Sequence, residues 1–169
     1  MAICIVLMAH RPHPSIRPYK VQRYCEKYRY LSVELQQQTG IPIPIILAIA
    51  GLETDWGNSE LARKANNHFG LKTKSDWSGP TYCKETWEYW GNYPERSTEC
   101  FRKYPLIRES YQDFGRFLKT RHYYNYLQSL SKTDYRSWAE TLEWGAYATD
   151  PEYAEKLQRI IWEYELSAP

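Results

Sequence analysis

The sequence predicts a mainly α fold (α+β) in which a helical body carries a small β-hairpin lobe. Apolar residues recur at helical spacing before residue 65 and again after residue 107. Between Asn66 and Lys103 that spacing is lost, and Gly, Pro, Thr, Tyr and Trp become frequent. Such a composition is typical of loops with a short antiparallel hairpin. A chain of 169 residues suits one domain with one sizeable core.

The first two helices are expected between residues 19 and 56. Apolar residues step by three and four positions from Tyr19 to Gln38, and Gly40 follows as a C-terminal stop. A second helix from about Pro44 to Trp56 is apolar on nearly all sides, with Pro44 suited to its first turn and Gly57 after its end. We therefore expect the second helix to be central and buried.

Four further helices are expected from capping residues and apolar stripes. One is short and lies before the hairpin, and the other three follow it. The first is capped by Asn58 or Ser59 and ends near Lys64. The second lies within Arg108–Thr120, and the third lies within Asp134–Tyr147 with Asp134 or Thr133 as its cap. The fourth lies within Asp150–Leu166, with Asp150 as N-cap and Pro151 at the first helical position.

Composition excludes two classes of function. The formal net charge is only +2, so the chain lacks the basic excess that binding a phosphate backbone requires, and we expect no nucleic-acid partner. No apolar run approaches the roughly 20 residues that span a bilayer, so we expect no membrane partner. The 16 Tyr and 7 Trp are numerous, and aromatic faces suit sugar rings as well as protein cores.

The first 18 residues are expected to be an N-terminal extension or linker ahead of a domain at 19–169. The stretch "MAICIVLMAH" is short and apolar, with no basic residue before it, so it is either the remnant of a secretion signal or the end of a strand or helix. The following "RPHPSIRPY" is proline-rich and extended in character.

The cysteines and histidines form no recognisable metal or nucleophile pattern. Cys4, Cys25, Cys83 and Cys100 show no C-x-x-C spacing, so we expect no metal site and no cofactor. Our preferred interpretation is four free, half-buried thiols, while Cys83 and Cys100 would pair if the protein is exported. No His is placed beside a Cys or Ser as in a cysteine peptidase or serine hydrolase.

Glu53 is the candidate acid. In "ILAIAGLETDWGNS" an apolar run leads up to this carboxyl at the end of the buried helix. Apolar surroundings disfavour the ionised carboxylate and raise its pKa, which suits a general acid. The alternative is a solvated glutamate at a helix end. Asp55, two residues on, either raises the pKa of Glu53 by charge repulsion or, as we expect, points to solvent.

Two downstream motifs, taken with "LETDWGNS", favour the first interpretation of Glu53. They are "NNHFGLK" at residues 66–72 and "YATDPEYAEKL" at residues 147–157. Together the three resemble family 73 of the glycoside hydrolases, the β-N-acetylglucosaminidases of bacterial cell walls. The resemblance extends over residues 19–165 and implies a lysozyme-like fold, with helices and a hairpin on either side of a sugar-binding groove.

The resemblance also implies roles for particular side chains. It makes Glu53 the general acid and places Tyr147 in the groove, where it orients either the acetamido group or the attacking water. The family takes a second carboxylate from the hairpin, in a "TxEY" pattern ahead of "FRxY". Here "TWEY" precedes "FRKY", and Glu88 stands 13 positions before Phe101. We therefore assign the second carboxylate to Glu88. The rival hairpin acids are Glu85, Glu95 and Glu99.

Substrate-binding residues are expected among the aromatic residues and the "NNHFGLK" motif. Aromatic rings are candidate platforms for sugar rings. For Phe69, core packing is the favoured alternative. The candidates are Trp56, Asn67, Phe69, Lys72, Trp77 and Trp90.

These expectations describe a secreted or periplasmic, monomeric peptidoglycan hydrolase. It would cleave the β-1,4 bond between N-acetylglucosamine and N-acetylmuramic acid, by inversion or with the substrate's acetamido group as nucleophile. The alternatives are a lytic transglycosylase, a lysozyme-type muramidase and a non-catalytic module that binds cell walls.

Overall fold

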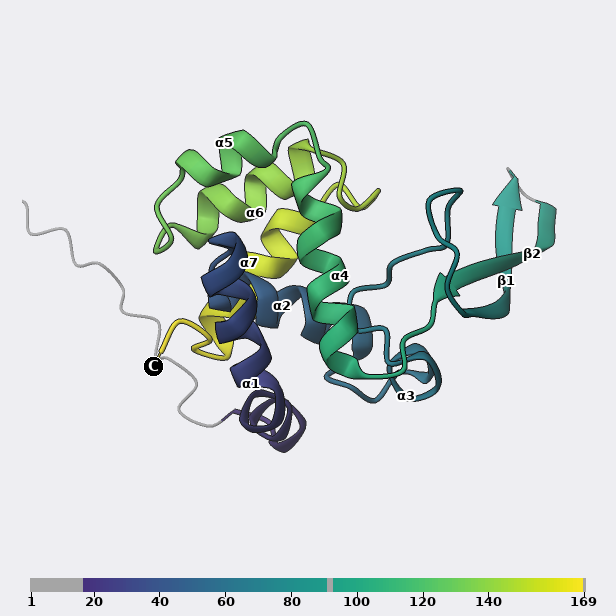
Figure 1. The fold of residues 1–169 in the computed structure, drawn as a ribbon, viewed down its shortest axis with the longest axis horizontal. Coiled ribbons are helices and arrows are strands. Elements are labelled where there is room, and N and C mark those ends of the chain that lie inside the picture. Colours follow the sequence, from purple (N-terminus) through teal and green to yellow (C-terminus); the bar gives the residue numbers. More distant parts are fainter. Residues whose placement is uncertain (1–16, 91–92, 169) are drawn as a thin grey trace, which may run out of the picture.

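The computed structural model describes residues 17–90 and 93–168, and within the hairpin the side chains of residues 86–90 and 93–95 lie outside that description. Nearly all of the expected N-terminal extension falls outside it as well. In the described part, helices form a body from which a two-stranded hairpin projects on the side of α4 (Figure 1). The elements are α1 (Tyr19–Thr39), α2 (Ile43–Thr54), α3 (Glu60–Ala65), β1 (Thr81–Trp90), β2 (Tyr93–Arg102), α4 (Ile107–Lys119), α5 (Tyr124–Ser129), α6 (Tyr135–Trp144) and α7 (Tyr153–Glu163).

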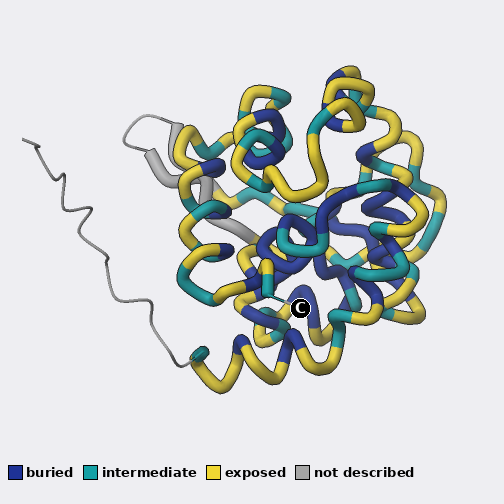
Figure 2. The backbone as a smooth tube through the Cα atoms, turned by 90° about the vertical axis from the view of Figure 1, so that its left-hand side faces the viewer, coloured by how far each residue is buried: buried dark blue, intermediate teal, exposed yellow. Residues whose placement is uncertain are grey.

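Helix α2 is the centre of the body, as its apolar sequence predicts. Every residue from Ile45 to Gly51 is buried, and α2 contacts α1, α6 and α7. Figure 2 shows buried positions gathered in the interior of this body, with exposed positions on its periphery. None of the helices in the described part is both long and apolar enough to cross a membrane.

The end of α2 differs from the prediction and bends the chain sharply. The helix stops at Thr54 rather than Trp56, and Asp55, Trp56 and Gly57 all have positive φ angles, of 47°, 56° and 83°. The Thr54 hydroxyl accepts a hydrogen bond from the backbone N–H of Gly57 at 2.9 Å. This left-handed run turns the indole of Trp56 back over Gly51, where a Cβ would come within 2.7 Å of the ring.

The hairpin is closed by a disulfide. Strands β1 and β2 pair antiparallel, and Cys83 lies directly opposite Cys100. Their sulfur atoms are bonded at 2.05 Å, so our preferred interpretation of four free thiols was wrong for this pair. The second interpretation, pairing across one loop-rich segment, was correct. Among the described cysteines, Cys25 is free and buried in the core.

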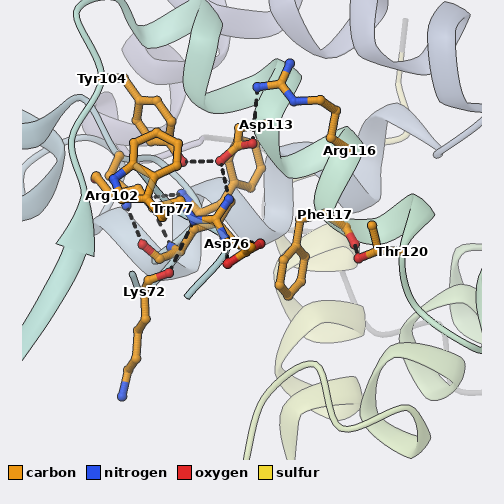
Figure 3. A network of polar contacts seen from close by, with 12 residues as sticks. Lys72, Asp76, Trp77, Arg102, Tyr104, Asp113, Arg116, Phe117 and Thr120 are labelled. Carbon is orange, nitrogen blue, oxygen red and sulfur yellow. Dashed lines mark hydrogen bonds and ion pairs between the residues drawn. The ribbon is translucent and has the colours of Figure 1, made fainter. Parts of the chain in front are cut away.

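An ion-pair network ties the base of the hairpin to the body. Arg102, at the end of β2, donates from Nη1 to Asp113 of α4 at 2.9 Å and from Nη2 to Asp76 at 3.1 Å (Figure 3). The hydroxyl of Tyr104 donates to the same Asp113 oxygen at 2.7 Å. Arg102 and Asp113 are buried, so each depends on the other for compensation of its charge.

The remaining helices match the prediction at some ends and differ at others. Gly40 ends α1 with a φ of 76°, and the expected caps Ser59 and Asp134 accept from the backbone N–H groups of Ala62 and Ser137. Helix α5 was not predicted. The last helix begins at Tyr153 rather than at Pro151, because residues 151–152 form a turn in which Asp150 accepts from the N–H of Glu152 at 3.0 Å.

Candidate active site

Glu53 lies in the last turn of α2, where the buried helix reaches a half-buried position. Burial raises the pKa of its carboxyl to about 6, and a hydrogen bond from Tyr153 opposes part of this rise. A carboxyl with a pKa near 6 keeps a proton at mildly acidic pH and can give it to a leaving oxygen. The carboxyl of Glu53 therefore has the raised pKa that its apolar sequence context predicts.

Tyr153 is the side-chain partner of Glu53. It stands at the start of α7, is 2% exposed, and its hydroxyl lies 3.5 Å from Oε1 of Glu53. Burial raises the pKa of the Tyr153 phenol well above its ordinary value, so the phenol stays protonated and acts as a donor. Two helices that are distant in sequence thus meet at the carboxyl.

Gly70 provides the space for the other carboxylate oxygen. Its φ of 64° lies in the left-handed region, and a Cβ built on it would come within 2.9 Å of Oε2 of Glu53. Glycine is suited to this position for both reasons, since it adopts positive φ readily and has no side chain. The loop after α3 is therefore shaped to admit the acid.

Tyr147 lies beside the pair formed by Glu53 and Tyr153. Its ring centroid is 5.6 Å from that of Tyr153, and its hydroxyl donates to the backbone carbonyl of Phe69 at 3.2 Å. Burial raises the pKa of the Tyr147 phenol well above its ordinary value, with a smaller contribution from the charge of Glu53. The structure thus brings Tyr147, Glu53 and the "NNHFGLK" loop together.

Asp55 and Trp56 take positions away from this cluster. The side chain of Asp55 is exposed and pairs with Lys20 at 2.5 Å, in accord with the expectation that it points to solvent. Trp56 is only 8% exposed and packs edge-on against Tyr24 and Tyr164. It has no open face for a sugar ring, because the left-handed turn after α2 folds it into the core.

The "NNHFGLK" loop contributes its shape rather than its side chains. Asn67 is fully buried, donates to the carbonyls of Leu71 and Arg102, and accepts from the N–H groups of Phe69 and Leu71. Phe69 stacks on Phe114 at 4.1 Å, as its alternative interpretation expected. His68 is buried and hydrogen-bonded to Tyr24 at 2.6 Å, and burial lowers the pKa of its imidazole to about 4.

A hollow of about 450 Å³ lies between α4 and the loop that precedes β1. Trp77 lines it, with Arg102 stacked at 5.0 Å from its ring centroid, and Phe117 lines the opposite side (Figure 3). The ring centroid of Phe117 is 6.1 Å from that of Tyr147, so one residue that lines this hollow packs against Tyr147. Lys72 is exposed on the loop and pairs with Glu99 at 2.6 Å.

The hairpin acids are distributed along both strands. Glu85 is exposed and pairs with Arg96 at 3.4 Å, and Glu99 pairs with Lys72. Glu88 is placed on β1 opposite Glu95 of β2. The side chains of Glu88, Glu95 and Trp90 lie outside the described residues.

Sequence reasoning missed two residues that touch Glu53, namely Tyr153 and Gly70. Tyr153 falls within "YATDPEYAEKL", where it reads as one of the apolar positions of the last helix. Gly70 falls within "NNHFGLK". Both signals were present, but only the three-dimensional structure shows that these residues meet one carboxyl.

Comparisons with known proteins agree with this geometry. A family model described as mannosyl-glycoprotein endo-β-N-acetylglucosaminidase, the Glucosaminidase family, matches residues 30–166. The chain is 38% identical over 125 residues to exo-glucosaminidase LytG of Bacillus subtilis, covering 72% of this chain and 44% of LytG. It is 33% identical over 125 residues to the peptidoglycan hydrolase FlgJ of Vibrio parahaemolyticus, covering 72% of this chain and 40% of FlgJ. The chain thus spans less than half of either relative.

Solved structures give the same result. A peptidoglycan hydrolase mutant from Sphingomonas sp. A1 superposes with a TM-score of 0.72 at 31% identity, covering 86% of this chain and 96% of that one. The catalytic domain of the autolysin Auto from Listeria monocytogenes gives 0.71 at 27% identity, with 90% and 89% covered. These matches confirm the lysozyme-like fold class that the sequence predicted. By its motifs, its fold and its match to the family model, the chain belongs to the glucosaminidase family, family 73 of the glycoside hydrolases.

Proposed function

We propose that this chain is a peptidoglycan hydrolase that cleaves the β-1,4 bond between N-acetylglucosamine and N-acetylmuramic acid, with Glu53 as the general acid. The observation that carries the proposal is the half-buried carboxyl of Glu53, whose pKa is raised to about 6 and whose side-chain partner is a neutral tyrosine. The relatives named as peptidoglycan hydrolases support the class of substrate. Glycan strands of peptidoglycan are the proposed partner.

The proposed reaction begins with proton transfer from Glu53 to the glycosidic oxygen. Because Oε1 accepts from Tyr153, we assign the transferable proton to Oε2, the oxygen beside Gly70. As the bond to the leaving sugar breaks, positive charge develops at the anomeric carbon, and water or the substrate's acetamido oxygen attacks it from the other face. We assign the orientation of that nucleophile to Tyr147, whose ring centroid lies 5.6 Å from that of Tyr153.

We assign the second carboxylate to Glu88 on the hairpin. Its sequence context and its place on β1 support this assignment. Glu85 and Glu99 are both engaged in ion pairs, which leaves them less suited to activating water. In this proposal the hairpin supplies the base, and the helical body supplies the acid.

We also propose that the enzyme works outside the cytoplasm, on the cell wall. The Cys83–Cys100 disulfide supports this, because such bonds persist in oxidising compartments.

The test is Glu53→Gln, which keeps the shape of the side chain and removes its proton. We expect turnover of purified peptidoglycan to fall by at least a thousandfold, since general-acid catalysis contributes about 10²–10⁴ and the neutral amide also loses charge stabilisation. Asp55→Asn is the matched control, because it removes an exposed acid two residues away. Hydrolysis at the parent rate by folded Glu53→Gln protein would refute the proposal.

Mass spectrometry of the released fragments identifies the bond and the mechanism. Reducing N-acetylglucosamine ends are expected. Anhydro-muramic ends would instead identify a lytic transglycosylase, and reducing N-acetylmuramic acid ends a muramidase.

A further inference from the structure

A second hollow, of about 500 Å³, lies between the start of α5 and helix α6 and shares no lining residue with the hollow beside Trp77. None of the residues assigned to the reaction lines it. Its lining combines aromatic rings with hydrogen-bonding side chains: His122, Tyr123, Tyr126, Ser137, Glu140, Thr141 and Trp144.

Two of its aromatic rings are unusually open to solvent. Trp144 is 72% exposed and Tyr126 is 58% exposed. Exposed aromatic residues that line a concave surface are typical of ligand sites, since their burial by a ligand releases water from a large apolar area. His122 lies beside Trp144 with ring centroids 5.9 Å apart and supports it from one side. The rings of Trp144 and Tyr126 are therefore available as flat apolar faces for a ligand.

The polar part of the lining suits a neutral, hydroxylated ligand. Glu140 is exposed, and its partner in the structure is Gln158 at 3.4 Å. The hydroxyl of Ser137 donates to Asp134 and that of Thr141 donates to the carbonyl of Ser137, so each retains acceptor capacity. No Lys or Arg belongs to the lining, which disfavours phosphate and other anions. A carboxylate among aromatic rings is the chemistry that binds a sugar, through its hydroxyls and its apolar face.

Side-chain contacts and neighbouring positions in the sequence lead from Tyr147 to the second hollow. Phe117 lies 6.1 Å from Tyr147 between ring centroids, and the guanidinium of Arg121 stacks on Phe117 at 4.1 Å. The next residue, His122, contacts Trp144, which itself precedes Tyr147 by three positions. The second hollow and Tyr147 are thus joined by one short segment of the chain, residues 144–147.

We infer that the hollow between α5 and α6 is a distal saccharide-binding site, which holds N-acetylated sugar units of the glycan strand beyond the site of cleavage. This inference rests on the proposed function, because it takes the same polymer as its ligand. Trp144 and Tyr126 stack on the sugar rings, and Glu140 accepts from their hydroxyls. The site increases the affinity for long strands.

The test measures binding separately from cleavage. In a Glu53→Gln background, which prevents turnover, affinity for insoluble purified peptidoglycan is compared between the parent and the double variant Trp144→Ala/Tyr126→Ala. We expect the double variant to bind at least tenfold more weakly, and Trp144→Tyr, which keeps a stacking ring, to lose less than threefold. Tyr30→Ala is the control, because Tyr30 is similarly exposed, at 52%, and does not line the hollow.

The second measurement compares a long substrate with a short one. With Glu53 intact, the loss of kcat/KM in the double variant should be at least fivefold greater on polymeric peptidoglycan than on a tetrasaccharide of alternating N-acetylglucosamine and N-acetylmuramic acid. Equal binding by parent and double variant, or equal losses on both substrates, would overturn the inference. Quenching of Trp144 fluorescence by choline but not by chitooligosaccharides would assign the hollow to a quaternary ammonium and also overturn it. A parent chain that binds peptidoglycan without ever cleaving it contradicts the proposed function alone.

Discussion

The hydroxyl of Tyr153 lies 3.5 Å from Oε1 of Glu53, so the first residue of α7 contacts the acid at the end of α2. The two residues are 100 positions apart in the sequence, and the contact forms only when both helices pack in the core. The Tyr153 hydrogen bond stabilises the ionised carboxylate and opposes the effect of burial. Tyr153 thereby adjusts the proton affinity of the acid and also fixes its direction.

Tyr153→Phe is expected to reduce kcat at the pH optimum by three- to tenfold and to leave KM nearly unchanged. It should also move the basic limb of the pH–rate profile to higher pH, because the pKa of Glu53 rises when the hydrogen bond is removed. Steady-state kinetics across pH 4–9 measures both effects. Tyr135→Phe on α6 is the control, and a profile unchanged in Tyr153→Phe would contradict the assignment.

Gly70→Ala is expected to reduce turnover strongly and to lower the stability of the fold only moderately. The new methyl group would come within 2.9 Å of Oε2 of Glu53, which forces the carboxylate out of position, and the positive φ adds a strain of about 1–2 kcal/mol. We expect kcat to fall more than tenfold.

Gly40→Ala is a closely matched control for that change. Gly40 also has a positive φ, and its added Cβ would meet only the flexible end of Gln128 at 3.0 Å, away from Glu53. Thermal unfolding should show similar losses of stability in the two variants, whereas turnover should fall only in Gly70→Ala. Equal activities would show that the space beside Oε2 is not required.

The raised pKa of Glu53 also makes the stability of the fold depend on pH. The native state holds the proton more tightly than the unfolded chain, so this contribution is fully present below pH 4.5 and is lost as pH rises through about 6. Glu53→Gln removes the cost of burying the charge. The free energy of unfolding of Glu53→Gln minus that of the parent should therefore be about 1–2 kcal/mol larger at pH 8 than at pH 4.

Urea unfolding at the two pH values measures this difference in the free energy of unfolding. Asp55→Asn, in which the acid is exposed and paired with Lys20, should show no comparable change between the two pH values. The same difference between parent and Glu53→Gln at both pH values would mean that the carboxyl is not held in a dry site.

Reduction of the Cys83–Cys100 disulfide is expected to loosen the hairpin and leave the helical body folded. An isolated two-stranded hairpin is marginally stable, and a cross-link that closes a loop of this length contributes about 3 kcal/mol in the chain-entropy account. Hydrogen exchange in residues 81–102 should accelerate with reductant or in Cys83→Ser/Cys100→Ser, while exchange in α2 stays slow. Cys25→Ala is the control. Unchanged protection of the hairpin would contradict this role.

The sequence predicted the helices that have clear stripes and caps, and the structure shows why other features escaped it. Helix α5 has only six residues, too few for a periodic pattern. Trp56 was expected at the substrate because nothing in "DWGN" shows that two non-glycine residues adopt positive φ. The disulfide required the strand register, which places Cys83 opposite Cys100.

The sequence predicted some residues of the candidate site and misplaced others. Glu53 and Tyr147 stand in motifs that could be identified, and the structure places them together. Asn67 and Phe69 stand in the same kind of motif, yet their side chains are buried in the loop and the core. A motif shows that a residue matters, but burial decides whether it contacts a ligand or shapes the backbone around it.

The described partners of Glu53 all come from the helical body and the loop at Gly70, and none comes from β1 or β2. The proposed proton donor is therefore held by described residues outside the two strands of the hairpin. A chimera that carries the hairpin of a relative is therefore expected to keep the raised pKa of Glu53, while the proposed base on the hairpin is replaced.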